Sequence, residues 1–374
     1  MDRLKKAIEE VREADLALAL AFERRMRAGG EVAACQREEG LPASVAVDPE
    51  TTVREVAPSL SDDLMRSYYP LFLKSVLGLS ESLNHRVAEG QRIAYAGVPG
   101  AFACAALQVR SFCPQTARPD GTLCPYPDFR LAYTAVEAGE CDAAVLPLEN
   151  SFAGDVAQVM DLAYFGSLYI NGVWEMRVSQ CLAGVTGANA DTVMTVISHP
   201  QALSQCAPFL AARGYALREE SNTAVAASRV AALGDPTVAA ICSPEAAALY
   251  GLTVLAANIN ENASNTTRFA VMTRVPHHAY RSDACFILTF TVRNEAGALA
   301  KAIAAIGAHG FNMRSLRSRP TKKLLWSNFF FLEAEGNLAS EEGKRMLDEL
   351  SAYVSGLKVL GSYEASVRSA EQAP

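Results

Sequence analysis

Residues 142–151 read Asp-Ala-Ala-Val-Leu-Pro-Leu-Glu-Asn-Ser, a short apolar run that ends in polar residues. The apolar part is typical of a strand buried on both faces, as strands of a parallel sheet are. The same pattern, an apolar strand followed by a polar turn and a helical stretch, occurs at 92–96, 192–197 and 237–242. Strands that alternate with helices predict parallel sheets covered by helices on both faces.

The polar residues that follow these strands are the first candidates for a ligand site. In open parallel sheets, ligands bind beyond the carboxyl ends of the strands. Hydroxyls, amides, helix N-termini and an arginine suit a small polycarboxylate, although such residues also cap helices. The cluster Asn265-Thr266-Thr267-Arg268-Phe269 favours a site, because a cap needs only one of its polar residues. The residues beyond the strand ends are 97–100, 149–151, 198–201 and 243–244.

The segments on either side of this α/β region have different patterns. Apolar residues at helical spacing predict helices in residues 1–90, with Gly29-Gly30 ending or loosening the first one. From about Ser282 the pattern predicts the βαββαβ order of ferredoxin-like domains. The predicted fold class is therefore multi-domain, with an all-α domain at 1–90, an α/β domain at 91–275 and an α+β domain at 282–366.

Composition and charge exclude several partners. The chain has 374 residues and a formal net charge of −7 without a basic stripe, so we expect no nucleic-acid partner. The longest apolar run, 16–22, is far shorter than the ~20 residues that span a bilayer, so we expect no membrane partner. The first residues are charged and no apolar signal segment follows them, which predicts a cytoplasmic location.

The sequence also lacks the common binding motifs for metals and cofactors. Its nine cysteines never form a Cys-x-x-Cys pair and it has only five histidines, so we expect no metal. It contains neither Gly-x-Gly-x-x-Gly nor a P-loop, so we expect no nicotinamide or nucleotide cofactor.

The order and spacing of four motifs resemble those of the prephenate dehydratase family. These motifs lie at 97–102, 147–154, 198–203 and 267–269, and the resemblance covers about residues 92–275. It implies a two-lobed fold like that of periplasmic binding proteins. The last segment resembles an ACT regulatory domain, and the first is similar to the chorismate mutase domain of bifunctional dehydratases.

The resemblance implies a reaction in which prephenate loses carbon dioxide and its ring hydroxyl to give phenylpyruvate, in L-phenylalanine biosynthesis. It assigns the catalytic triplet to Thr267, Arg268 and Phe269. A neutral threonine acts by donating a hydrogen bond to the leaving oxygen. Arg268 either holds a carboxylate or anchors its loop, and Glu149 is a competing general acid or a structural residue. The implied substrate-binding residues are Asn150, Ser151, Gln201 and Thr223.

The resemblance to chorismate mutase implies a second reaction, the conversion of chorismate to prephenate. That rearrangement needs cationic groups around a dianion, and the segment has fewer cations than the family pattern. We therefore expect either a weakened mutase or a domain kept for dimerisation. The candidate residues are Arg25, Gln36, Ser80 and Asn84.

The ACT resemblance implies L-phenylalanine as an effector and association into a homodimer or homotetramer. Arg317 stands where many relatives have glutamate. Either the ammonium group of the effector is bound by backbone carbonyls or Asn294, or the effector is a different molecule. The remaining alternative is that Arg317 has no part in binding and only faces solvent. A competing function is a non-catalytic small-molecule sensor. The candidate effector residues are Asn294, Gly297, Ala298, Leu299, Arg317, Ser318, Arg319 and Pro320.

Overall fold

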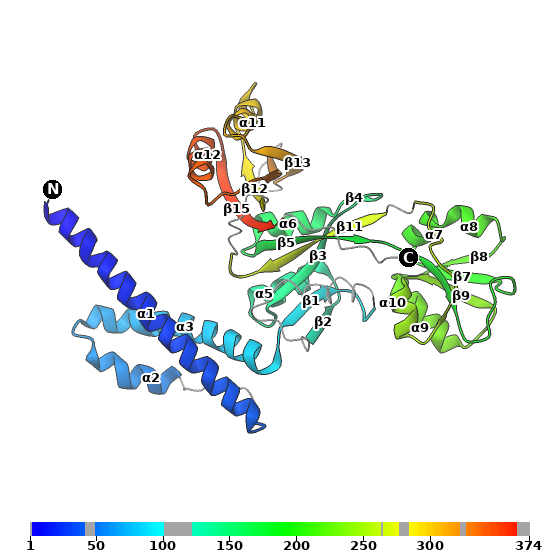
Figure 1. Ribbon diagram of the computed structural model, residues 1–374, viewed down its shortest axis with the longest axis horizontal. Helices are drawn as coiled ribbons and strands as arrows, with labels where there is room; N and C mark the ends of the chain where they lie inside the picture. The colour runs from blue at the N-terminus through cyan, green and yellow to red at the C-terminus, as the bar shows by residue number, and fades with distance from the viewer. Residues whose placement is uncertain are drawn as a thin grey trace. The chain divides into compact units, whose positions relative to one another are not determined.

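The computed structural model describes residues 2–41, 49–100, 122–262, 265–276, 284–321 and 327–364 (Figure 1). Contacts divide the described chain into two compact units, a helical one up to Arg92 and a mixed α/β one from Ile93 onward, with Thr122 grouped with the first. The domain boundaries expected at residues 90, 275 and 282 stay predictions.

The first unit is helical, as predicted. It consists of α1 (Asp2–Glu38), α2 (Pro49–Val56), a short 3-10 helix (Ala57–Ser59) and α3 (Asp63–Glu89). Gly29-Gly30 neither ends nor breaks α1, which continues to Glu38. The helix tolerates these glycines because Ala33, one turn further on, is completely buried in the unit, and such packing outweighs a propensity cost of about 1 kcal/mol per glycine.

The first lobe of the second unit is built on a sheet of order β2-β1-β3-β11-β5, with β4 paired to β3. Strand β1 runs parallel to β3, whereas β11 is antiparallel to both β3 and β5. The sheet is therefore mixed, not parallel throughout as expected, because β11 returns from the second lobe. The strands are β1 (Arg92–Ala96), β2 (Thr122–Tyr126), β3 (Ala143–Asn150), β4 (Gly154–Asp155), β5 (Tyr169–Arg177) and β11 (Thr266–Thr273).

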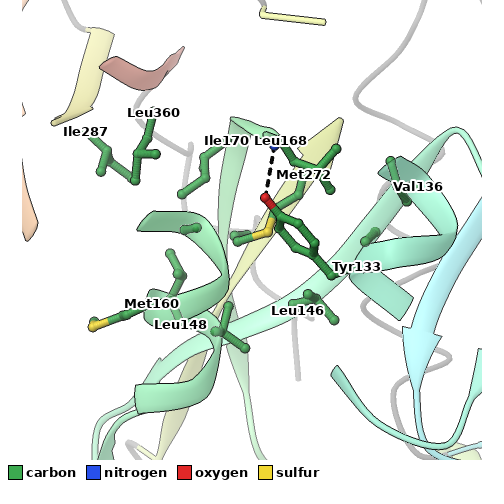
Figure 2. Close-up of a cluster of buried hydrophobic side chains, with 14 of the residues drawn as sticks. Tyr133, Val136, Leu146, Leu148, Met160, Leu168, Ile170, Met272, Ile287 and Leu360 are labelled. Carbon is green, nitrogen blue, oxygen red and sulfur yellow. Dashed lines mark hydrogen bonds between the residues drawn. The ribbon is translucent and has the colours of Figure 1, made fainter. Parts of the chain in front are cut away.

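Two helices, α5 (Phe129–Glu137) and α6 (Ala157–Phe165), contribute to the core of this lobe. Asp128 begins α5 by accepting a hydrogen bond from the Leu131 amide at 2.8 Å, an N-cap that satisfies an otherwise orphan donor. Figure 2 shows the buried Tyr133, whose hydroxyl accepts from the Leu168 amide at 2.9 Å. The core therefore satisfies the polar end of this buried tyrosine.

The second lobe has a sheet of order β10-β6-β9-β7-β8. Strands β7, β8 and β9 are mutually parallel, and β6 is antiparallel to β9 and β10. The chain leaves the first lobe after β5 and returns to it at β11, which is the two-lobed arrangement that was predicted. The elements are β6 (Cys181–Gly184), β7 (Thr195–Ser198), α7 (Pro200–Gln205), α8 (Ala207–Ala211), β8 (Ala216–Glu219), α9 (Thr223–Leu233), β9 (Val238–Cys242), α10 (Pro244–Leu249) and β10 (Thr253–Ala256).

The C-terminal part has the predicted βαββαβ order. It forms an antiparallel sheet of order β13-β14-β12-β15, the ferredoxin-like arrangement, which we call the C-terminal sheet. Its elements are β12 (Ala284–Thr291), α11 (Ala298–Ala308), β13 (Asn312–Pro320), β14 (Asn328–Glu335), α12 (Glu341–Ser351) and β15 (Ser355–Glu364).

The C-terminal sheet shares a hydrophobic core with the first lobe. Ile287 and Leu360 belong to the same buried cluster as Leu168 and Ile170 (Figure 2). Gly361 approaches β5 so closely that a Cβ atom there would lie 2.2 Å from the Ile170 carbonyl oxygen. Only glycine permits this approach, so Gly361 allows β15 to lie against β5.

Candidate active site

The site is built where β3 ends and β11 begins. Asn150 and Thr267 are direct partners in the antiparallel ladder, and Asn150 Nδ2 donates to Thr267 Oγ1 at 2.9 Å. The same amide group donates to Asn265 Oδ1 at 2.8 Å, while Asn150 Oδ1 accepts from the Phe152 and Ala153 amides. Both ends of the carboxamide are therefore fixed, and its NH₂ group faces Thr267.

Ser151 joins this cluster through the backbone of Thr266. The Ser151 amide donates to the Thr266 carbonyl at 2.8 Å, and Ser151 Oγ accepts from the Thr266 amide at 2.9 Å. As an acceptor, the serine hydroxyl keeps its own proton for another partner. The structure thus brings together Asn150, Ser151 and Thr267, as the sequence predicts, and adds Asn265.

Thr267 is positioned to donate a hydrogen bond. Thr267 is buried, with 8% of its surface exposed, and its Oγ1 already accepts a hydrogen bond from Asn150. The hydroxyl proton is therefore the group that it can offer to a ligand. A donor aimed at an oxygen that gains negative charge is the usual means of stabilising a departing hydroxide.

Phe269 does not belong to this polar cluster. It is 1% exposed and packs in the core with Ile93, Val145 and Val271. A fully buried ring does not reach a ligand in this position, and the place of Phe269 in the catalytic triplet stays a prediction.

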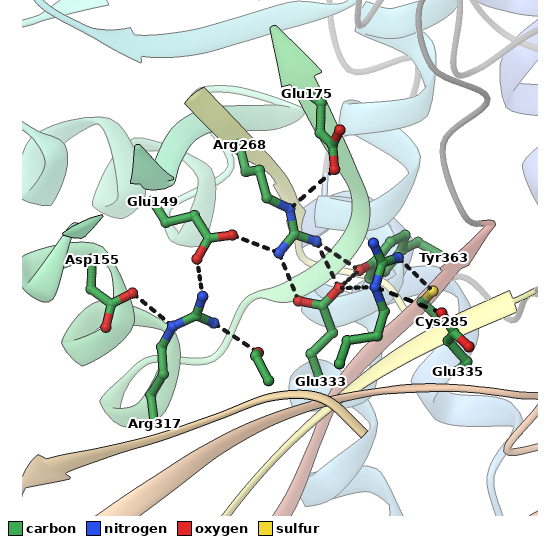
Figure 3. A network of polar contacts seen from close by, with 11 residues as sticks. Glu149, Asp155, Glu175, Arg268, Cys285, Arg317, Glu333, Glu335 and Tyr363 are labelled. Atoms are coloured by element: carbon green, nitrogen blue, oxygen red, sulfur yellow. Dashed lines mark hydrogen bonds and ion pairs between the residues drawn. The ribbon is translucent and has the colours of Figure 1, made fainter. Parts of the chain in front are cut away.

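Arg268 points to the opposite face of the sheet from Thr267, since side chains alternate along a strand. Figure 3 shows its guanidinium between Glu149, at 2.9 Å, and Glu333, at 2.9 and 2.7 Å. Tyr363 donates to Glu333 at 2.5 Å. Of the two roles expected for Arg268, these contacts are those of an anchor and not of a group free to hold a substrate carboxylate.

Glu333 carries the charge that Arg268 balances. It is 1% exposed, and burial alone would raise its pKa, but the hydrogen bonds and charge of Arg268 together with the Tyr363 hydroxyl hold the pKa below its usual value. Burial and the neighbouring Glu333 carboxylate raise the pKa of Tyr363. The sequence gives one signal for this residue, a glutamate inside the apolar run Phe329-Phe330-Phe331-Leu332 and Ala334, but no signal for its partner.

Glu149 lies on the Arg268 face of the same ladder. One of its carboxylate oxygens accepts from Arg268 and the other from Arg317 of the C-terminal sheet (Figure 3). Both oxygens are therefore occupied on the face away from the Thr267 hydroxyl. This geometry favours the structural role of Glu149 over the general acid.

Gln201 and Thr223 lie in the second lobe, outside the cluster around Thr267. They follow β7 and β8, whose carboxyl ends meet at one edge because the strands are parallel. Thr223 is the first residue of α9, after the N-cap Asn222, and Gln201 is exposed at the start of α7. His199 accepts from the Gln201 amide at 3.2 Å, so this histidine is a helix cap.

Three of the four mutase candidates have described side chains. Arg25 and Gln36 are half-buried on α1, and Ser80 is buried on α3, whereas the side chain of Asn84 lies outside the described residues. Arg25 Nη1 is buried and has no hydrogen-bond partner in the described structure. A groove of about 580 Å³ lies nearby, lined by Phe22, Glu23, Met26, Arg27, Gly30, Glu31, Ala34 and Leu83, none of them a candidate.

The effector candidates divide into two groups. Gly297 is the N-cap of α11 with φ +81°, Ala298 is buried, and Leu299 packs against the core beneath the C-terminal sheet. Asn294, Ser318 and Pro320 are exposed. Arg317 and Arg319 contact the first lobe instead, at Asp155 and Asp161 respectively, both at 2.7 Å. The expectation that Arg317 only faces solvent is therefore wrong, because carboxylates of the first lobe surround it.

Among the described residues, no group of three or more His, Cys, Asp or Glu side chains could hold a metal ion. Within the same residues, no helix is both long and apolar enough to cross a membrane.

A two-lobed α/β unit with hydroxyl and amide groups at paired strand ends defines a class of proteins that bind small polar molecules. The prephenate dehydratase family model matches residues 93–277. The chain belongs to this family, which confirms the main resemblance inferred from the motifs.

Named relatives cover most of the chain. Arogenate dehydratase/prephenate dehydratase 2 of Arabidopsis thaliana is 31% identical over 300 residues, which is 76% of either chain. The bifunctional chorismate mutase/prephenate dehydratase of Enterobacter agglomerans is 33% identical over 288 residues, covering 76% of this chain and 73% of the relative. A solved prephenate dehydratase from Arthrobacter aurescens, in complex with L-Phe, matches with a TM-score of 0.66 and 28% identity, covering 73% of this chain and 90% of that one.

Proposed function

We propose that this chain converts prephenate to phenylpyruvate, carbon dioxide and water. The observation that carries the proposal is the Asn150–Thr267 pair, which leaves a buried hydroxyl with a proton to donate. Aromatisation of the ring drives the reaction, so the enzyme needs mainly to bind the substrate and assist departure of hydroxide. Thr267 donates to that oxygen, Asn150 orients Thr267, and Ser151 offers its hydroxyl proton to a carboxylate.

The second lobe supplies further donors in this proposal. Gln201 and Thr223 follow parallel strands that end at a common edge, where ligands of such sheets bind. The second lobe would then hold the carboxylate that the first lobe does not reach, and closure over the substrate would exclude water.

The experiment compares prephenate with arogenate as substrates, because several relatives are named as dehydratases of one or both compounds. The purified chain is given each substrate alone, and formation of phenylpyruvate or phenylalanine is measured. Faster turnover of prephenate supports the proposal, and turnover of arogenate alone replaces it with the other activity. No product from either compound favours the sensor alternative.

Chorismate mutase activity is a second proposal, carried by the helical unit and the bifunctional relative. Arg25 Nη1 is buried and has no hydrogen-bond partner among the described residues, so we infer that the Arg25 guanidinium is the cation that meets the dianion. Chorismate supplied alone gives phenylpyruvate if the helical unit works. If prephenate is turned over and chorismate is not, the helical unit serves association only.

Feedback by L-phenylalanine through the C-terminal sheet is also a proposal. Its support is the βαββαβ order and the L-Phe complex of the solved relative. Addition of L-phenylalanine to the prephenate assay should lower the rate, and an unchanged rate rejects the effector. Association into a homodimer or homotetramer is a further proposal, supported by the apolar residues exposed along α1. The cytoplasmic location stays a prediction.

A further inference from the structure

Glu149 and Asp155 place two carboxylates side by side. They are direct partners in the β3–β4 hairpin, whose tip is Ser151 to Ala153. Like charges directly opposite each other in an antiparallel pair repel and destabilise it. Something must offset this repulsion, because the same hairpin carries Asn150 and Ser151.

Arg317, on β13 of the C-terminal sheet, offsets the repulsion between Glu149 and Asp155. Its Nη2 donates to Glu149, its Nε lies 2.7 Å from Asp155 Oδ1, and Nη1 donates to Ser315 at 2.8 Å. Figure 3 shows the guanidinium inserted between the two carboxylates. The side chain is 20% exposed, so solvent screens these contacts only partly.

Arg317 adds to the Ser151–Thr266 hydrogen bonds and the Arg268–Glu149 ion pair at the end of the β3–β11 ladder. The register shifts between Arg268 and Phe269, so the two rungs Thr267–Asn150 and Arg268–Glu149 lie beyond a bulge. A bulge interrupts the ladder hydrogen bonds locally. Ion pairing of Glu149 therefore stabilises the residue pair next to Asn150 and Thr267, and so helps to keep their hydrogen bond in place.

We propose that Arg317 is a positioning residue for dehydration: from the C-terminal sheet it holds Glu149 and Asp155, and thereby keeps Asn150 and Thr267 in register. The inference rests on the proposed function. It explains why an arginine occupies this position of β13, since a carboxylate there would add a third negative charge to the pair.

Kinetic variants test the proposal. Arg317→Gln should lower kcat for prephenate about tenfold, with KM within about twofold of the wild type. Arg317→Lys keeps the charge and should restore most of the rate. Asp155→Asn in the Arg317→Gln background removes the repulsion and should restore part of it, which loss of a merely structural contact would not.

Lys358→Met is the matched control. Lys358 Nζ donates to the carbonyls of Ala163 and Gly166, so it joins the C-terminal sheet to the first lobe away from Asn150. Its loss should leave kcat unchanged. If Lys358→Met lowers kcat as much as Arg317→Gln does, or if Arg317→Gln keeps the wild-type kcat, the proposal is overturned.

Hydrogen exchange separates this inference from the proposed function. Arg317→Gln should speed exchange of the Ser151, Phe152 and Ala153 amides, and Lys358→Met should not. This readout needs no turnover, so it judges the role of Arg317 even if the wild-type chain produces nothing from prephenate or arogenate. Unchanged exchange in Arg317→Gln would contradict the proposal.

Discussion

The carboxamide of Asn150 determines which proton Thr267 can offer. Because its Nδ2 donates to Thr267 Oγ1, the threonine acts as an acceptor there and its own proton remains available. The backbone amides of Phe152 and Ala153 hold the other end of the carboxamide, which prevents its reversal.

Asn150→Asp should therefore lower kcat about 100-fold with little change in fold. The aspartate cannot donate to Thr267, so the threonine hydroxyl turns to donate to the carboxylate. Steady-state kinetics with prephenate measure the effect. Asn171→Asp is the control, because Asn171 makes a similar bond to Thr273, at 2.6 Å, on the same sheet. Equal losses in the two variants would contradict this account of Asn150.

Arg268 illustrates what a motif cannot specify. The triplet Thr267-Arg268-Phe269 is recognisable in the sequence, but strand alternation and the position of the C-terminal sheet decide where each side chain points. Arg268 consequently pairs with the buried Glu333, 65 residues away, and not with Thr267.

Arg268→Met should reduce the free energy of unfolding by about 3–5 kcal/mol, because the buried Glu333 loses both of its charged hydrogen bonds and keeps only the more distant Arg314, whose Nε lies 3.8 Å away. Denaturant unfolding measures this loss, and Arg268→Met with Glu333→Leu should recover much of it. Arg229→Met is the control: it breaks the pair with Glu220, in which Arg229 is 42% exposed, and should cost far less because solvent screens the pair. A loss no larger for Arg268→Met than for the control would reject the buried pair as a source of stability.

At the scale of elements, His309 connects α11 to α12, the two helices that pack on the C-terminal sheet. It is the C-cap of α11, and its ring nitrogens lie 2.5 Å from Glu342 and 2.9 Å from Glu349 of α12. Hydrogen bonds that the His309 ring donates to these carboxylates raise the pKa of His309 above its usual 6.5.

The stabilisation from this contact should depend on pH. A raised histidine pKa stabilises the fold fully below the unfolded-state pKa, and the stabilisation is lost as pH rises through the folded-state pKa. His309→Gln should therefore lower the midpoint of thermal unfolding more at about pH 6 than at about pH 9. A difference between the two proteins that does not change with pH would show that the imidazolium charge has no part in it.

Elements with a strong local pattern were predictable, and those set by distant packing were not. Apolar strands with polar ends located β1, β3, β7 and β9. The antiparallel direction of β11 depends on the chain returning from the second lobe, which no local pattern records. The continuation of α1 past Gly29-Gly30 likewise depends on packing around Ala33.

At the scale of the whole molecule, the C-terminal sheet and the first lobe share one core and one charged network. The sequence indicates the βαββαβ pattern but does not reveal that Arg317 and Arg319 pair with Asp155 and Asp161. Pairings over such separations depend on the final arrangement of the sheets. This is why residues expected at an effector site are found in contact with the first lobe.

The most direct test of the account is the rate of phenylpyruvate formation from prephenate by the wild type, Thr267→Ser and Thr267→Ala. Removing the donor should lower kcat about 100- to 1,000-fold in Thr267→Ala, while its circular dichroism and thermal unfolding stay close to those of the wild type. Thr267→Ser keeps the hydroxyl and should retain much of the rate. A folded Thr267→Ala with a near-normal rate would contradict the assignment of this hydroxyl as the catalytic donor.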